Sequence, residues 1–195
     1  MLASRGCVLL VVVAIMAPAC QRSQGEAGQQ ASDAAPVYMP DATVKDLMQS
    51  IIDPSADIVW LSVKYEANRS GAVDYAPKTD EEWANARHGA IALAEAANLL
   101  LIPGRHVARP GEASEVPGIE LEPAEMEKMI VADRPTWNAR AKALHDATMN
   151  TLRAIEAHDP VKVFESGAAI DEACENCHTH YWYPNEKVPE FPRKP

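Results

Sequence analysis

The chain has 195 residues, of which 47% are hydrophobic, and a formal net charge of −10 at pH 7. This length favours a single domain. The acidic balance argues against nucleic-acid binding, which depends on lysine and arginine contacts to phosphates, and would steer the protein towards a basic partner. The sequence contains no catalytic triad, carboxylate pair or nucleotide-binding loop, so we do not expect an enzyme.

The first residues are typical of an export signal. Arg5 precedes the apolar run CVLLVVVAIMA, which is shorter than the roughly 20 residues of a membrane-spanning helix and fits the hydrophobic region of a signal peptide. Cleavage after Ala19 would remove residues 1–19. The segment APAC resembles a bacterial lipobox, which predicts a lipidated Cys20. The alternatives are a secreted protein that begins with an unmodified cysteine and an uncleaved anchor.

The next segment has the composition of a linker. Residues 21–40, QRSQGEAGQQASDAAPVYMP, are rich in Gln, Ala, Ser, Gly and Pro. A flexible chain of this length spans about 25 Å. We therefore expect residues 20–40 to form a tether and residues 41–195 to form the domain. This arrangement predicts a periplasmic lipoprotein anchored to a membrane, with a soluble periplasmic protein as the alternative.

The first helix of the domain is expected after the capping segment at residues 41–43. Pro54 lies inside it and should kink or split it. Residues 67–78 contain Gly71 and Pro77 and are expected to form a loop. The apolar stripe of this helix, at helical spacing, contains Val44, Leu47, Met48, Ile51, Ser55, Ile58 and Val59.

Three more amphipathic helices follow, with no strand pattern. Together they predict an all-α, antiparallel four-helix bundle. A long Pro- and Gly-rich loop at residues 103–122 separates the second helix from the third, and loops of this length tend to be functional. The expected boundaries are Thr79 and Pro103 for the second helix, Pro123 and Asp159 for the third region, with a break at Pro135 and a new cap at Asp133, and Pro160 and Pro184 for the fourth.

The fourth helix carries the chemistry. Cys174, Cys177 and His178 form the C-x-x-C-H pattern of a c-type haem attachment site. On a helix the three side chains share one face, so two thiols can add to the vinyl groups of one porphyrin while His178 reaches the iron. Zinc binding with His180, a thioredoxin-like pair and a disulfide are alternatives. Four zinc ligands in seven residues strain a tetrahedron, no strand precedes the pair, and helical spacing disfavours a disulfide. The sequence thus predicts one covalently attached haem c.

The second axial ligand should come from the same end of the bundle as His178. In an up-down-up-down bundle the start of the first helix meets the end of the fourth. Met48 lies on the inward stripe, roughly 9 Å along the first helix. Arg105 and Arg109 are candidates for pairing with the haem propionates. The alternatives to Met48 are Met126, Met129, His106 and an iron that is left five-coordinate.

A helical bundle with ACENCH in its last helix and a methionine early in its first resembles the class II c-type cytochromes. These are the cytochrome c prime family and its low-spin relatives, and the resemblance covers residues 41–184. It implies a four-helix haem domain, Met48 as axial ligand, and pairing into a homodimer through the first two helices. The chain differs from the family pattern in its longer loop at 103–122 and in THYWYP after the motif.

These observations lead to a functional expectation. We expect a monohaem c-type cytochrome that carries electrons in the periplasm, with a low-spin haem held by His178 and Met48. Its partners would be redox proteins of the periplasm or the membrane. The alternative is a five-coordinate haem protein that binds nitric oxide or carbon monoxide.

Overall fold

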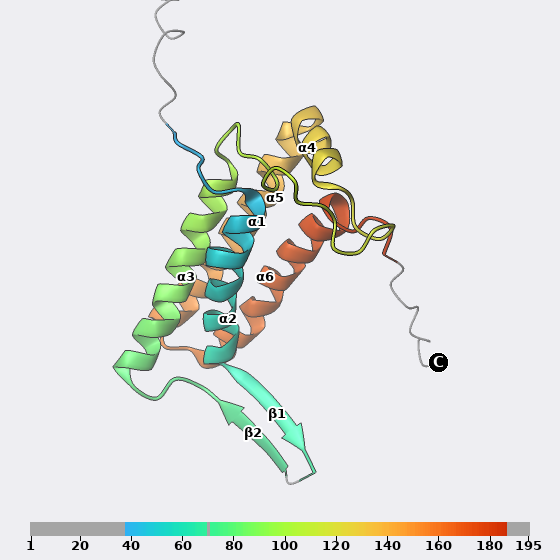
Figure 1. The fold of residues 1–195 in the computed structure, drawn as a ribbon. Coiled ribbons are helices and arrows are strands. Elements are labelled where there is room, and N and C mark those ends of the chain that lie inside the picture. Colours follow the sequence, from blue (N-terminus) through green and yellow to red (C-terminus); the bar gives the residue numbers. More distant parts are fainter. Residues whose placement is uncertain (1–37, 70, 187–195) are drawn as a thin grey trace, which may run out of the picture. The chain divides into compact units, whose positions relative to one another are not determined.

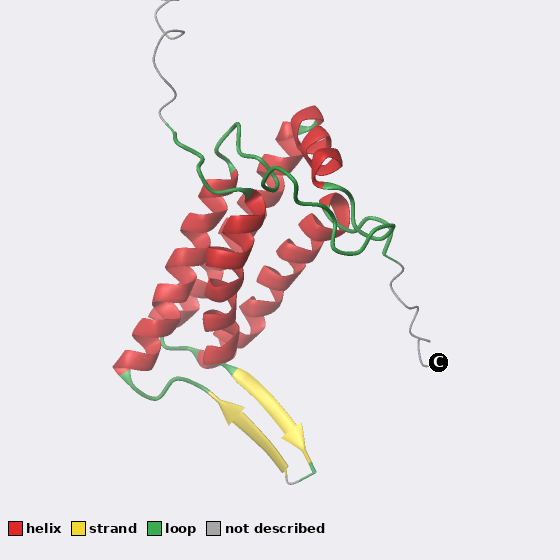
Figure 2. Ribbon diagram, viewed as in Figure 1, coloured by secondary structure: helices red, strands yellow, loops and turns green. Residues whose placement is uncertain are grey.

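Helices dominate the part of the chain that the computed structural model describes, which is residues 38–69 and 71–186 (Figures 1 and 2). These residues belong to the unit Tyr38–Pro195. The predicted signal peptide, with Cys20 and the tether as far as residue 37, lies outside the described residues. Within the described ranges, no helix is both long and apolar enough to cross a membrane.

The first helical segment changes its hydrogen-bond pattern before Pro54. Thr43 and Asp46 form a capping box, in which each side chain accepts a hydrogen bond from the other's backbone N–H at 3.0 Å. Because Pro54 has no N–H, the carbonyl of Ser50 lacks its usual partner four residues on. The chain forms a π-helical turn here, in which Asp53 N–H donates to Met48 O. The segments are α1 (Val44–Leu47), η1 (Met48–Ile52) and α2 (Asp53–Ser62).

An antiparallel hairpin follows α2, which corrects the expectation of an all-α chain with a loop at 67–78. Strands β1 (Lys64–Asn68) and β2 (Gly71–Tyr75) pair with Lys64 opposite Tyr75. Lys64 Nζ lies 4.5 Å from the centroid of the Tyr75 ring. Tyr65 and Tyr75 are 58% and 42% exposed, so neither strand buries an apolar face among the side chains that the structure describes. The chain is therefore mostly helical rather than all-α.

The remaining helix starts are confirmed where the sequence predicted them. Thr79, Asp133 and Asp159 cap the three longest helices, each accepting a hydrogen bond from the backbone N–H three residues on at 3.1–3.2 Å. Proline follows two of these caps, in the first turn, where its missing N–H costs no intrahelical bond. The helices are α3 (Asp80–Leu100), α4 (Pro123–Ala132), α5 (Arg134–Glu156) and α6 (Pro160–Tyr181).

The long helices pack in a chain of neighbours. Helix α3 lies against both α2 and α5, and α5 lies against α6, whereas α2 and α6 touch only over a short stretch (Figure 1). Two threonines are fully buried in α5, and their hydroxyls donate to carbonyls one turn earlier, so neither hydroxyl is left unpaired. The largest fully buried apolar side chains are Leu93, Ile155, Ile170, Val59 and Val163.

Gly89 permits the close approach of α3 to α2. A Cβ atom at this position would lie 2.7 Å from Ile58 Cγ2 and 3.0 Å from the carbonyl oxygen of Ser55. Real Cβ atoms do not come so close, and the second neighbour is backbone, which cannot rotate away. The contact between the two helices therefore depends on the absence of a side chain here.

Gly89→Ala should destabilise the protein by about 1–3 kcal/mol, the usual cost of overpacking a core. Helix propensity alone would predict the opposite change in stability, because alanine at an exposed helical site stabilises a helix by roughly 0.5–1 kcal/mol relative to glycine. Urea denaturation measures both. Asn85→Ala on the exposed face of the same helix is the control and should be neutral or slightly stabilising. A Gly89→Ala variant more stable than wild type would contradict the close packing.

Candidate functional site

One pocket brings together the four residues that the sequence singled out. Met48 reaches it from η1, and Cys174, Cys177 and His178 reach it from α6. The pocket holds about 820 Å³ of free space, part of which is open to solvent. Its other lining residues are Ile52, Asp53, Ala56, Trp60, Leu100, Trp137, Arg140, Ala141, Leu144, Asp171, Ala173 and Glu175.

A hydrogen bond from Trp60, which lines the pocket, joins α2 to α6. Trp60 Nε1 donates a hydrogen bond of 3.2 Å to the carbonyl oxygen of Gly167. A Cβ on Gly167 would lie only 3.3 Å from Trp60 Cδ1, so the glycine lets the indole lie directly on the helix. Helix α6 packs extensively against α5 but has few neighbours in α2. The space left between them is lined by Met48 on one side and the cysteines on the other.

The two cysteines are free thiols that lie half-buried in the wall of the pocket. Burial raises the pKa of Cys174 to about 12, and the nearby Cys177 and the carboxylates of Asp171, Asp53 and Glu175 raise it further in the same sense. Burial also raises the pKa of Cys177 to about 11, although Arg140 partly offsets it. Both thiols are therefore neutral at physiological pH.

His178 is partly covered by aromatic rings. Its side chain is 22% exposed, and Nδ1 lies 3.7 Å from Glu175 Oε1. The imidazole meets the Trp182 ring edge-on, with centroids 5.2 Å apart. Because Nδ1 faces the carboxylate, Nε2 is the nitrogen left for a ligand.

Arg140 is a pocket residue that the sequence reasoning missed. Its Nε is buried and has no hydrogen-bond partner among the described residues, while Nη1 donates to the carbonyl of Asn176 in α6. Buried polar groups are rarely left unpaired, so this nitrogen fits a site that takes a polar ligand. The sequence did contain a sign of this role, because Arg140 is a charged residue within the apolar stripe of α5, three residues after Trp137 and four before Leu144.

The other candidates for the iron or its propionates lie away from the pocket. Met126 and Met129 pack against the core from α4. His106 is exposed, and its Nδ1 lies 2.6 Å from Glu127 Oε1. Arg105 donates to the backbone carbonyls of Leu99 and Ala42, and Arg109 pairs with Asp46. Neither arginine lines the pocket, although the sequence had suggested both as partners of the haem propionates.

The long loop at residues 103–122 is anchored on α1, close to Met48. The carbonyls of His106 and Val107 accept hydrogen bonds of 2.9 and 3.0 Å from the N–H groups of Val44 and Lys45. These N–H groups lie in the first turn of the helix and have no partner within it. Val107 is also buried. The loop thus completes the start of the helical segment that carries Met48.

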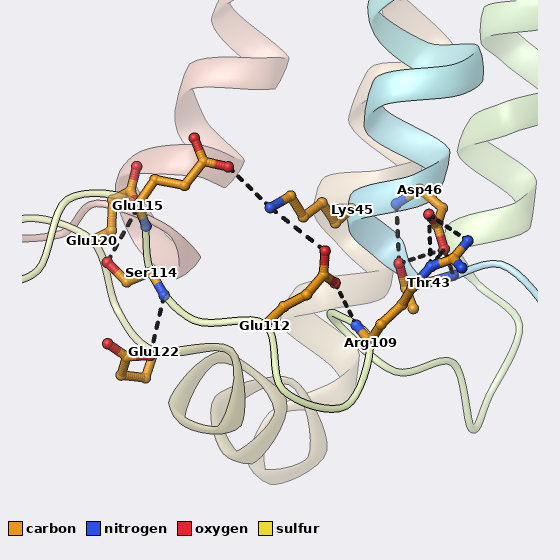
Figure 3. A network of polar contacts seen from close by, with 9 residues as sticks. All are labelled: Thr43, Lys45, Asp46, Arg109, Glu112, Ser114, Glu115, Glu120 and Glu122. Atoms are coloured by element: carbon orange, nitrogen blue, oxygen red, sulfur yellow. Dashed lines mark hydrogen bonds and ion pairs between the residues drawn. The ribbon is translucent and has the colours of Figure 1, made fainter.

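Ion pairs reinforce this anchor (Figure 3). Arg109 Nη2 lies 3.1 Å from Asp46 Oδ1, and Lys45 Nζ lies 2.9 Å from Glu115 Oε1. Hydrogen bonds from Thr43 and Arg109 lower the pKa of Asp46 to about 2. Its stabilising contribution is therefore complete above the ordinary carboxyl pKa and is lost as the pH falls towards 2.

The carboxylate of Glu120 organises the other half of the loop. It accepts a hydrogen bond from the Ser114 hydroxyl at 3.2 Å (Figure 3). It also accepts hydrogen bonds from the backbone N–H groups of Glu115 and Val116, at 2.8 and 3.0 Å. The next residue, Leu121, donates its N–H to the carbonyl of Trp182 at 2.8 Å. The loop therefore reaches from the start of α1 to the chain just after α6.

Comparison with known proteins gives no match to a family model, to a curated protein or to a solved structure. Within residues 38–69 and 71–186, no three or more His, Cys, Asp or Glu side chains are grouped to hold a metal ion. A zinc site would need such a group, whereas a haem iron takes four ligands from its porphyrin and only axial ones from the protein. The motif and the pocket are thus the features that point to a function.

We expect the apoprotein, with Cys7 and Cys20 replaced by serine, to alkylate slowly at pH 8. A raised pKa reduces the thiolate fraction about tenfold per unit, and the higher nucleophilicity of a more basic thiolate offsets only part of this loss. Iodoacetamide should therefore modify both cysteines at least about tenfold more slowly than in urea, with Cys174 the slower because its pKa is higher. Peptide mass spectrometry gives the two rates. Equal rates in native and unfolded protein would contradict the raised pKa values.

Proposed function

We propose that the protein is a monohaem c-type cytochrome that carries electrons, with an antiparallel four-helix bundle formed by η1–α2, α3, α5 and α6. The observation that carries this proposal is that Met48, Cys174, Cys177 and His178 line one pocket. The first of these is far from the other three in sequence. The three residues of the C-x-x-C-H pattern thus share a pocket with a methionine whose sulfur could bind the iron.

The residues of the pocket fit a haem in several ways. Two neutral thiols lie on one wall, and each would add its S–H bond across a vinyl group, with sulfur bound to one carbon and the proton to the other. This addition needs no oxidant. The apolar side chains of Ile52, Ala56 and Leu144 suit the faces of a porphyrin. Arg140 offers an unpaired N–H to an acidic group.

The axial residues determine which chemistry the protein can perform. A bound haem would supply an iron that takes up and gives back one electron. His178 would hold the iron from the side of α6 and Met48 from the side of η1, so that neither face is left for a small molecule. A thioether ligand favours the ferrous state and raises the reduction potential. These roles support an electron carrier over a gas-binding protein.

The proposed location and partners follow from the sequence. An exported chain, lipidated at Cys20, would hold the haem domain close to a membrane in the periplasm, where c-type haems are attached. The net charge of −10 favours redox partners that present a basic surface. Assembly into a homodimer belongs to the same proposal.

Production of the full chain in a host that matures c-type cytochromes tests the proposal directly. We expect a coloured protein whose mass includes one haem, located on the peptide that contains both Cys174 and Cys177. The same mass measurement reports a lipid on Cys20. Replacing both cysteines by serine should abolish haem attachment. A colourless wild-type protein in which both thiols still react would contradict the proposal.

Met48→Ala tests the axial ligand. We expect the ferrous wild-type protein to be low-spin and unchanged by carbon monoxide, because the sulfur closes the second face. The variant should become high-spin and bind carbon monoxide. Met129→Ala, which removes a methionine outside the pocket, is the matched control and should keep the wild-type spectrum. Carbon monoxide binding by the wild type would favour the five-coordinate alternative, and a Met48→Ala variant that keeps its sulfur-ligand band would exclude Met48.

A further inference from the structure

The chain after α6 folds back over the motif. The N–H groups of Trp182 and Tyr183 both donate to the carbonyl oxygen of His178, at 2.8 and 3.0 Å. The Trp182 carbonyl in turn accepts from Leu121 of the long loop. The segment that follows the motif and the loop at 103–122 are therefore one structural unit, and this unit lies directly against His178.

This unit fixes a carboxylate beside the imidazole. The Tyr183 hydroxyl lies 2.9 Å from both oxygens of Glu175, close enough to hold the carboxylate in place. Glu175 Oε1 faces His178 Nδ1 at 3.7 Å, and the ring centroids of Tyr183 and His178 are 5.9 Å apart. This distance is longer than a normal N–H···O hydrogen bond, so Nδ1 and the carboxylate face each other in this structure without being hydrogen-bonded.

An imidazole that binds a metal through Nε2 carries its proton on Nδ1, and an acceptor for that proton fixes the orientation of the ring. A carboxylate acceptor also makes the imidazole a more basic ligand. More electron donation to the iron stabilises its ferric state. The effect on the reduction potential is thus opposite to that of a methionine sulfur.

Building on the haem attachment proposed above, we propose that Glu175, held by Tyr183, is the positioning residue that accepts the Nδ1 proton of His178 and lowers the reduction potential of the iron. Glu175 belongs to the motif by position, as the first variable residue between the cysteines. The motif itself does not require glutamate there. Its carboxylate lies between the Tyr183 hydroxyl, which would hold it, and the His178 imidazole, which it would orient.

The test uses the full chain, matured with haem, as wild type, Glu175→Gln, Tyr183→Phe and Glu172→Gln. The last variant removes the same charge from an exposed site on α6 and is the matched control. Two quantities are measured in each protein. One is the rate at which the Nδ1 proton of His178 exchanges with solvent in the ferrous, low-spin form, followed by NMR, and the other is the reduction potential.

We expect proton exchange to become about tenfold faster in both Glu175→Gln and Tyr183→Phe, which is the effect of losing a hydrogen bond to a charged group. The potential should rise in both variants, more in Glu175→Gln, and the rise there should exceed that in Glu172→Gln. A role limited to holding the end of α6 would lower stability without moving either quantity.

The proposal is overturned if haem-loaded Glu175→Gln and Tyr183→Phe match Glu172→Gln in both measurements, and the proposed haem function then still stands. If Glu175→Gln takes up no haem because the residue lies inside the attachment motif, Tyr183→Phe decides alone. A wild type that binds no haem overturns both proposals together.

Discussion

The contact between Trp60 and Gly167 determines where the helices separate. It joins α2 to α6 through a hydrogen bond and a close approach of the indole to the backbone of Gly167, where a Cβ would be tightly packed. Because α6 packs along α5 from there on, its second half is left apart from η1 and α2. This C-terminal half of α6 carries Cys174, Cys177 and His178, which line the pocket. The pocket is therefore a consequence of one helix being attached to two neighbours over unequal lengths.

The long loop has the complementary role, because it connects the two elements that the pocket separates. At one end its carbonyls satisfy the first-turn N–H groups of α1, just before Met48, and at the other Leu121 bonds to Trp182, just after His178. Surface ion pairs such as Arg109–Asp46 are individually worth little, since solvent screens them. The backbone hydrogen bonds and the buried Val107 are the stronger part of the anchor. The loop thus links the helical segment that carries Met48 to the chain that follows His178.

Sequence reasoning succeeded where the determining interactions are local. The caps at Thr79, Asp133 and Asp159 depend on residues three positions apart, and so they could be read directly. The hairpin was missed because its exposed side chains carry no burial signal. The loop anchors, Arg140 and the Glu175–Tyr183 contact were missed for different reasons. The loop anchors join residues more than sixty positions apart. Arg140 lies within an apolar stripe of α5, and the Glu175–Tyr183 contact depends on how the chain turns after α6.

The turn before Pro54 explains why the predicted stripe of the first helix was only partly right. In a regular helix, each step of four residues rotates the side chain by about 40°, so Met48 and Trp60, three such steps apart, would face directions about 120° apart. The π-helical turn at Met48–Ile52 has more residues per turn and so reduces this angular difference. Met48, Ile52, Ala56 and Trp60 accordingly all line one pocket. Ile52 and Ala56 are buried accordingly, although the predicted stripe omitted both. The π-helical turn before Pro54 thus allows Met48 and Trp60, twelve residues apart, to line the same pocket as the cysteines of α6.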